Sequence, residues 1–157
     1  MPISNPFDSS SPVIGEATID IDKNIHDVFL YVGENFFENY PKWAIEVEEF
    51  EVLDSSKVFV VAKAKQIRRD NGQKVESIFE ITDFHPDSTL VFKGISAPYR
   101  HSYLLVCDEE NNPTHLTFRF ELLELDVFMR PFQKLIRYAI EEGAENTVEN
   151  IKNLITI

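Results

Sequence analysis

The sequence HLTFRFEL at residues 115–122 alternates apolar and polar side chains, and FQKLIRYAIEEGAENTVENIKNLI at residues 132–155 repeats apolar ones at helical spacing. A period of two is typical of a strand that buries one face, whereas a recurrence every three or four residues is typical of an amphipathic helix. Pro131 is tolerated only near a first turn, so the helix should begin at about residues 128–131 and run for about 25 residues. A strand and one long helix therefore close the chain.

Upstream of this pair, the sequence predicts a meander of strands separated by turn residues. Together with a last strand at about 114–124, they are expected at about residues 16–22, 43–53, 57–68, 74–84, 89–95 and 99–107. Asn71-Gly72 is the strongest hairpin signal, because this pair accepts the positive φ angles of a tight turn. The apolar alternation shifts near Glu48 and Glu49, which indicates a bulge and hence a curved sheet.

Two short helical segments are expected between the first and second strands. Asn24 can cap the first, which should end at Gly33, and the second covers Asn35–Tyr40 before Pro41. One strand, two short helices, six strands and one long helix form a two-layer α+β pattern.

Length and composition fit a single domain. The 157 residues are 43% hydrophobic and 12% aromatic, enough to bury a continuous core. Residues 1–13 contain three prolines and a run of three serines and are interpreted as a flexible lead-in. Residues 14–157 are expected to form the domain.

Charge and targeting features exclude several classes of partner. The 27 acidic and 15 basic residues give a formal charge of -12, which disfavours nucleic acid and anionic lipid headgroups. A short basic stretch is expected on the solvent face of one strand: Lys63, Lys65, Arg68 and Arg69. Cys107 is single, and no signal peptide or apolar run of about 20 residues is evident, so we expect a cytoplasmic protein without an integral membrane segment. The sequence makes no prediction of oligomeric state.

A curved sheet crossed by one helix should leave space between them. Three small residues, Ala139, Gly143 and Ala144, lie midway along the buried stripe of the helix. They are compatible with close packing of the helix on the sheet and equally with room for a ligand.

The order of these elements resembles the helix-grip superfamily, which includes START lipid-transfer domains, the birch pollen allergen family and the polyketide cyclase/dehydrase group (SRPBCC proteins). The resemblance spans residues 15–155 and is carried by Ile19–Asp22 leading into Asp27–Phe29, by Asn39–Trp43, by the meander and by the terminal helix. It implies a seven-stranded antiparallel sheet around the helix, with an apolar tunnel between them. It also implies a role in binding, carrying or transforming a hydrophobic small molecule.

Motifs for metal, cofactor or nucleophilic chemistry are absent from the sequence, and we expect neither a metal nor a cofactor. The histidines lack the spacing of metal ligands: His26, His85, His101 and His115. Gly94–Ala97 lacks the second glycine of a nucleophile elbow, and no glycine-rich phosphate loop is present.

Tyr99, His101 and Tyr103 alternate along one expected strand and therefore share one face. On a concave face they would place three polar groups in an apolar cavity and orient a ligand, whereas on a convex face they are ordinary surface residues. The same parity continues through Leu105 and Cys107, which favours the inside. His101 is then the candidate general acid or base.

The main hypothesis is a protein that binds a small hydrophobic or aromatic molecule, as a lipid- or polyketide-type carrier or sensor. Trp43 fits a tunnel mouth or the core, and the phenylalanines fit the pocket or the core. The expected ligand-binding residues are Trp43, Phe79, Phe92, Tyr99, His101, Tyr103, Phe118, Phe120, Ile136 and Ala139. The alternatives are an enzyme similar to polyketide cyclases or dehydratases, and a protein-interaction module with a closed tunnel.

Overall fold

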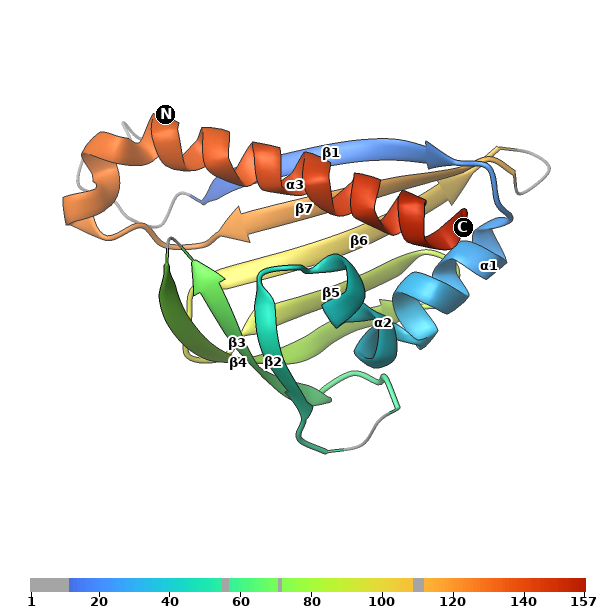
Figure 1. The fold of residues 1–157 in the computed structure, drawn as a ribbon, viewed down its shortest axis with the longest axis horizontal. Coiled ribbons are helices and arrows are strands. Elements are labelled where there is room, and N and C mark those ends of the chain that lie inside the picture. The colour runs from blue at the N-terminus through green and yellow to red at the C-terminus, as the bar shows by residue number, and fades with distance from the viewer. Residues whose placement is uncertain (1–11, 55–56, 71, 109–111) are drawn as a thin grey trace, which may run out of the picture.

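A seven-stranded antiparallel sheet curls around one long helix in the computed structural model, which describes residues 12–54, 57–70, 72–108 and 112–157 (Figure 1). The strands are β1 (Val13–Ile21), β2 (Val47–Val52), β3 (Lys63–Asp70), β4 (Gln73–His85), β5 (Thr89–Gly94), β6 (Tyr99–Cys107) and β7 (Thr114–Leu122). Their order in the sheet is β1-β7-β6-β5-β4-β3-β2. The α+β architecture expected from the sequence is confirmed. The lead-in expected at residues 1–13 lies almost wholly outside the described residues.

Three short helical elements connect the two edges of the sheet: α1 (Ile25–Phe29), η1 (Leu30–Glu34) and α2 (Phe36–Trp43). Asn24 caps α1 as expected, since its side-chain oxygen accepts a hydrogen bond from the backbone nitrogen of His26 at 2.8 Å. The chain does not leave the helical path at Gly33, which lies inside the π-helical turn η1. Trp43, expected at the start of a strand, is instead the last residue of α2.

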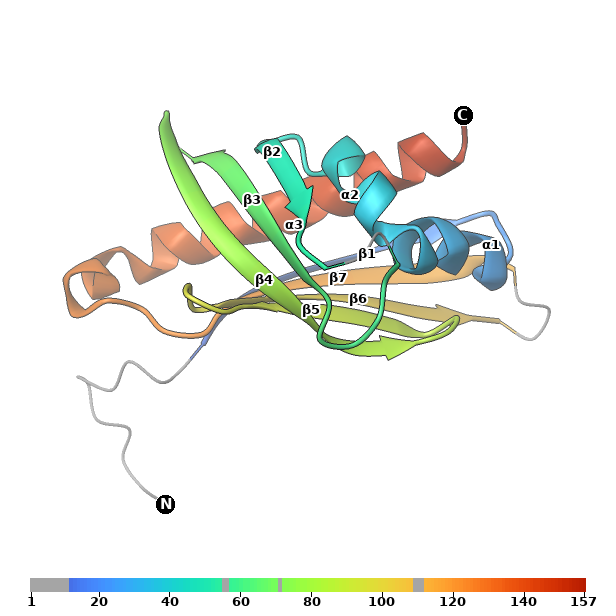
Figure 2. The same cartoon turned by 90° about the horizontal axis from the view of Figure 1, so that it is seen from below.

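The sheet bends at two places where the strand register shifts. The shift between Val47 and Glu49 on β2 is the bulge expected there. A second shift, between Ile81 and Asp83 on β4, was not expected from the sequence. As a result β2, β3 and the first half of β4 rise from the rest of the sheet towards the long helix (Figure 2).

The strand expected at residues 57–68 begins later, at Lys63. Val61 has a φ of 73°, a left-handed conformation that interrupts a strand, and its amide donates to the Ile81 carbonyl. At the other end of β3, Gly72 has a φ of 81° in the hairpin to β4, as the turn signal predicts.

The long helix α3 (Gln133–Ile155) follows a 3-10 turn, η2 (Val127–Phe132), which contains Pro131. It packs tightly against the sheet at Gly15 on β1, where an added Cβ would lie 2.6 Å from the Ile140 carbonyl carbon. Its buried residues all lie in its second half: Ala144, Val148 and Ile151. The described helices are all too short or too polar to span a bilayer.

Candidate functional site

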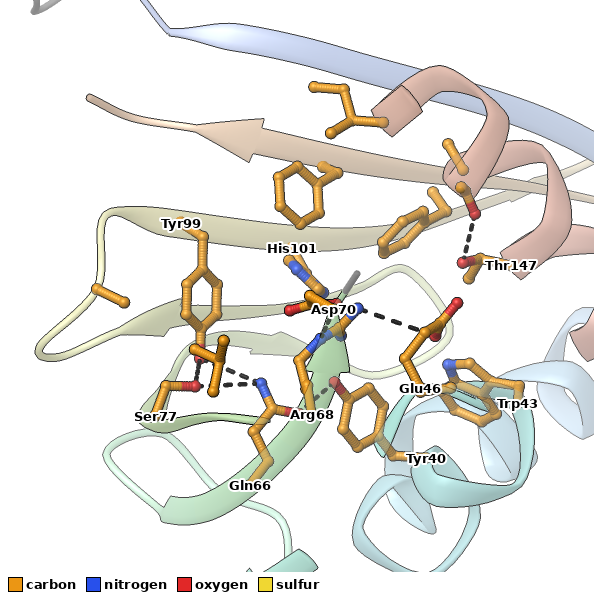
Figure 3. A pocket seen from close by; sticks show the side chains of 18 of the residues that line it. Tyr40, Trp43, Glu46, Gln66, Arg68, Asp70, Ser77, Tyr99, His101 and Thr147 are labelled. Atoms are coloured by element: carbon orange, nitrogen blue, oxygen red, sulfur yellow. Dashed lines mark hydrogen bonds and ion pairs between the residues drawn. The ribbon is translucent and has the colours of Figure 1, made fainter. Parts of the chain in front are cut away.

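A cavity of about 410 Å³ lies between the concave face of the sheet and α3. This volume falls within the range of about 300–1,000 Å³ that is usual for small-molecule sites. The lining residues come from α2, the loop between α2 and β2, the strands β3, β4, β6 and β7, the loop between β5 and β6, and α3 (Figure 3). Five of them are exposed and form the rim: Glu46, Asp70, Val75, Ala139 and Gly143.

The helix wall of the cavity is built from small residues. A Cβ added at Gly143 would have no atom within 4 Å, in contrast to the crowded Gly15. Ala139 and Ala144 border the same space. The sequence left open whether the small residues of the helix provide close packing or open space. At Gly143 the space is open, and the close packing of helix and sheet occurs at Gly15 on β1.

Tyr99, His101 and Tyr103 all line the cavity, so the shared face of β6 is the concave one. The Tyr103 hydroxyl accepts a hydrogen bond from Trp43 Nε1 at 3.2 Å. The Tyr99 hydroxyl lies 3.0 Å from Ser77 Oγ. Burial raises the pKa of Tyr99 and of Tyr103, so both phenols are neutral at ordinary pH.

Gln66 connects the polar groups on the sheet side of the cavity. Its Oε1 accepts a hydrogen bond from the Tyr40 hydroxyl at 2.7 Å. Its Nε2 donates to Tyr99 at 3.3 Å and to Ser77 Oγ at 3.4 Å. Burial also raises the pKa of Tyr40, so the whole network is uncharged.

His101 is packed among aromatic rings. Its ring centroid lies 4.5 Å from that of Phe92 and 4.7 Å from that of Phe120. Its Nδ1 is buried and makes no hydrogen bond to any described residue. Burial, assisted by the positive charge of Arg68, holds the pKa of His101 well below its usual value, so the imidazole is neutral.

Arg68 is a cation in the cavity wall. Its guanidinium lies 3.8 Å from a carboxylate oxygen of Glu46 and 3.8 Å from one of Asp70 (Figure 3). Burial tends to lower the pKa of Arg68, but Tyr40 and the two carboxylates outweigh it and raise the pKa. Arg68 is therefore charged, next to two compensating anions.

The expectation that Arg68 lies on a solvent face is wrong. Ala64, Gln66 and Arg68 alternate along β3, and all three point to the concave side. Lys63, Lys65 and Arg69 lie on the other side, each within 4 Å of a glutamate carboxylate. The same alternation would have identified Gln66 and Arg68 from the sequence.

The structure places most of the expected ligand-binding residues along the cavity: Trp43, Tyr99, His101, Tyr103, Phe118, Phe120 and Ala139. Phe79 and Phe92 are fully buried, with ring centroids 4.1 Å apart, and belong to the core. Ile136 is half-buried, one turn before Ala139, and is not among the lining residues. Sequence reasoning missed seven polar lining residues: Tyr40, Glu46, Gln66, Arg68, Asp70, Ser77 and Thr147.

The other described histidines lie outside the cavity. His26 Nδ1 is 3.0 Å from a carboxylate oxygen of Asp87, and His115 bonds to Asp20 and Asp108. No group of three or more His, Cys, Asp or Glu side chains in the described part of the chain is arranged to hold a metal ion.

Comparison with known proteins adds to this geometry. No protein-family model matches the sequence, and no curated protein matches it. Solved structures do match. The Zhui aromatase/cyclase from Streptomyces sp. R1128 superposes with a TM-score of 0.74 at 9% identity, over 93% of this chain and 94% of that one. The chain has the helix-grip fold.

Two further proteins with this helix-grip arrangement extend the likeness. The protein TTHA0849 from Thermus thermophilus has a TM-score of 0.73 at 16% identity, over 91% of this chain and 97% of its own. Ginseng major latex-like protein 151 from Panax ginseng has a TM-score of 0.63 at 12% identity, over 90% and 96%. The fold implied by the sequence resemblance is thereby confirmed.

Proposed function

We propose that this protein binds a small, uncharged, apolar or aromatic molecule in the cavity between the sheet and α3. The single observation that carries the proposal is the cavity itself, in which a few polar groups converge on a largely apolar space. Proteins with the same fold include one named an aromatase/cyclase and one named a major latex-like protein.

The walls favour a planar apolar or aromatic ligand. Trp43, Tyr103, Phe118 and Phe120 present aromatic rings, and Ile140 faces them from α3. Aromatic rings pack against one another in offset or edge-on arrangements, which favours a ligand that itself carries a ring. The ten residues expected from the sequence remain our proposed binding set. Seven line the cavity, Phe79 and Phe92 support them from the core, and Ile136 lies one turn before Ala139 on α3.

The charges favour a neutral ligand. Arg68 is the cation of the wall, and Glu46 and Asp70 beside it carry two negative charges. A carboxylate on the ligand would therefore enter a site without net positive charge. His101 is neutral and offers one donor and one acceptor, which suit a hydroxyl or carbonyl group.

Fluorescence offers a direct test, because Trp43 is the chain's one tryptophan and lines the cavity. The purified protein would be titrated with a flavonoid, an aromatic polyketide analogue and a fatty alcohol. We expect quenching of Trp43 and a rise in melting temperature, since saturation at about 100 times Kd stabilises a protein by about 2.7 kcal/mol.

A substitution that fills the cavity supplies the control. Gly143→Leu would place its side chain in the open space and should abolish the quenching, whereas Glu142→Leu on the exposed neighbouring position should not. If no ligand class changes the fluorescence or the melting temperature, or if Gly143→Leu binds as the wild type does, the proposal is wrong.

Catalysis on such a ligand is a second candidate function, favoured by the neutral, unpartnered imidazole of His101. Because burial lowers the pKa of this imidazole, it is a weak base, but its N–H could donate a hydrogen bond to a ketone oxygen and so favour loss of the adjacent proton to water. Exchange of that proton for deuterium in an aryl ketone, followed by NMR, would test it. Exchange no faster than in buffer, or unchanged in His101→Gln, would remove this candidate.

Two other expectations remain as predictions. An interaction module with a closed tunnel has no observation in its favour, because the cavity is not filled by side chains. The absence of nucleic-acid partners is a prediction from charge, and the cytoplasmic location remains a separate prediction from the sequence, which a fractionation experiment would test.

A further inference from the structure

A basic and apolar segment projects from one end of the molecule, just before α3 reaches the cavity. We call residues 127–138 the α3 tip; it comprises η2 and the first turns of α3. Its exposed large apolar residues include Phe128, with 83% of its surface accessible, and Leu135, with 67%. The others are Val127, Met129, Phe132 and Tyr138.

The charge of the α3 tip is opposite to that of the chain. It contains Arg130, Lys134 and Arg137 and no acidic residue, whereas 12 basic and 27 acidic residues elsewhere give -15. Asp126 before the tip and Glu141 after it mark its limits. The expectation that this protein is repelled by anionic lipids therefore does not hold at this end.

Apolar and basic side chains occupy adjoining parts of the helix surface. Leu135 and Tyr138 are three positions apart, as are Lys134 and Arg137, and Lys134 is also a neighbour of Tyr138, four positions later. Lys134 and Arg137 form no ion pair with any other residue in the described ranges, so their charges are available.

The shape of the α3 tip distinguishes among the partners that such a surface could meet. Figures 1 and 2 both show η2 and the start of α3 extending beyond the ends of β1 and β7. The helix lies against the sheet at Ile140, opposite Gly15, beyond the α3 tip. A protruding apolar tip has no wall to hold a peptide or helix, but it can insert into a fluid interface.

We propose that the α3 tip docks this protein on an anionic membrane surface. Phe128 and Leu135 enter the boundary between headgroups and acyl chains, and Lys134 and Arg137 contact the anionic headgroups. The remaining negative charge is repelled by the same surface and keeps the rest of the molecule in water.

Docking would have a consequence for the cavity. The tip leads directly into Ala139 and Ile140, which line the cavity, so the α3 side of the cavity would face the bilayer. An apolar ligand could then pass from the membrane to the protein. This consequence rests on the proposed function, whereas docking itself does not require a ligand.

Flotation of the full chain with lipid vesicles tests the proposal. We expect binding to phosphatidylcholine vesicles containing one quarter phosphatidylglycerol, and much weaker binding to phosphatidylcholine alone. Lys134→Gln with Arg137→Gln should weaken binding about 25-fold, because each basic residue near an anionic surface contributes a factor of about five. Phe128→Ser with Leu135→Ser should abolish it.

Matched controls lie on exposed positions away from the tip: Lys93→Gln on β5 and Val106→Ser on β6. Both should bind as the wild type does, and circular dichroism should show all variants folded. Wild type that does not float, or tip variants that float equally well, would overturn the proposal. The proposal would also be overturned if the wild type were a dimer that binds no vesicles and Phe128→Ser with Leu135→Ser were a monomer, because the tip would then bind a second copy of the chain. Quenching of Trp43 by ligand is a separate measurement, so a failure of docking and a failure of ligand binding can be told apart.

Discussion

Two glycines should respond in opposite directions to substitution by alanine: Gly143 within α3, and Gly15 on β1 opposite α3. Gly143 lies inside α3 with nothing within 4 Å of an added Cβ, whereas a Cβ on Gly15 would lie 2.6 Å from the Ile140 carbonyl carbon. Ala is favoured over Gly by about 0.8–1.0 kcal/mol in a helix interior. Gly143→Ala should therefore raise the free energy of unfolding by about that amount.

Gly15→Ala should have the opposite effect, because the obstructing atoms belong to the backbone of Ile140 and Glu141 and cannot rotate away. The helix would have to move from β1, and overpacking of this kind costs about 1–3 kcal/mol. The two variants should thus differ in free energy of unfolding by about 2–4 kcal/mol.

Urea unfolding followed by Trp43 fluorescence and by circular dichroism would measure this difference. The slope with urea should remain constant if only the native state is affected, and each kcal/mol should shift the melting temperature by about 2–4 °C. If Gly143→Ala destabilised the protein, the space beside α3 would not be open. If Gly15→Ala were neutral, the contact with Ile140 would not hold the helix.

Three further predictions concern the polar groups. His101 should remain neutral on acidification, because burial lowers its pKa. The free energy of unfolding should fall as the pH drops below about 6.5, because the unfolded chain then takes up a proton that the folded chain does not. NMR titration of the imidazole would test this, and a midpoint near pH 6.5 would contradict it. The pKa of His115 should lie above that of a free histidine because of its hydrogen bonds to Asp20 and Asp108. The stabilisation by these bonds is complete below about pH 6.5 and is lost as the pH rises through the folded pKa. NMR titration should show a lower pKa for His115 in Asp20→Asn. Tyr40→Phe should cost about 1–3 kcal/mol in urea unfolding because it leaves Gln66 Oε1 without its donor, and an unchanged midpoint would show that water replaces the phenol.

The arrangement of strands and helices could be predicted largely from local patterns. The alternation in β7 depends on neighbouring residues and was found correctly. The helical spacing also identified α3, but the expected buried stripe is wrong in its first half, where Leu135 is exposed. The late start of β3 at Lys63 could not be predicted from neighbouring residues. Val61 has a left-handed conformation there, and its amide donates to the carbonyl of Ile81, twenty residues later. Local propensity contains no information about such a partner.

The cavity was harder to predict than the fold. Alternation placed Tyr99, His101 and Tyr103 on one face but could not show which face was concave. Phe79 and Phe92 are as apolar as Phe118, and only the depth of the core separates them from the wall. Charge alone predicts exposure for Arg68 and therefore misplaces it, because in the structure its guanidinium is accompanied by two carboxylates.

The position of β1 at an edge has a consequence for synthesis of the chain. This strand pairs with β7, and Thr18 contacts Thr117, 99 residues later in the sequence. The first strand to leave a ribosome therefore has to wait for the last one before its hydrogen bonds form. Until then its apolar face and backbone groups are open to other chains, so nascent molecules should depend on chaperones most strongly just before β7 emerges.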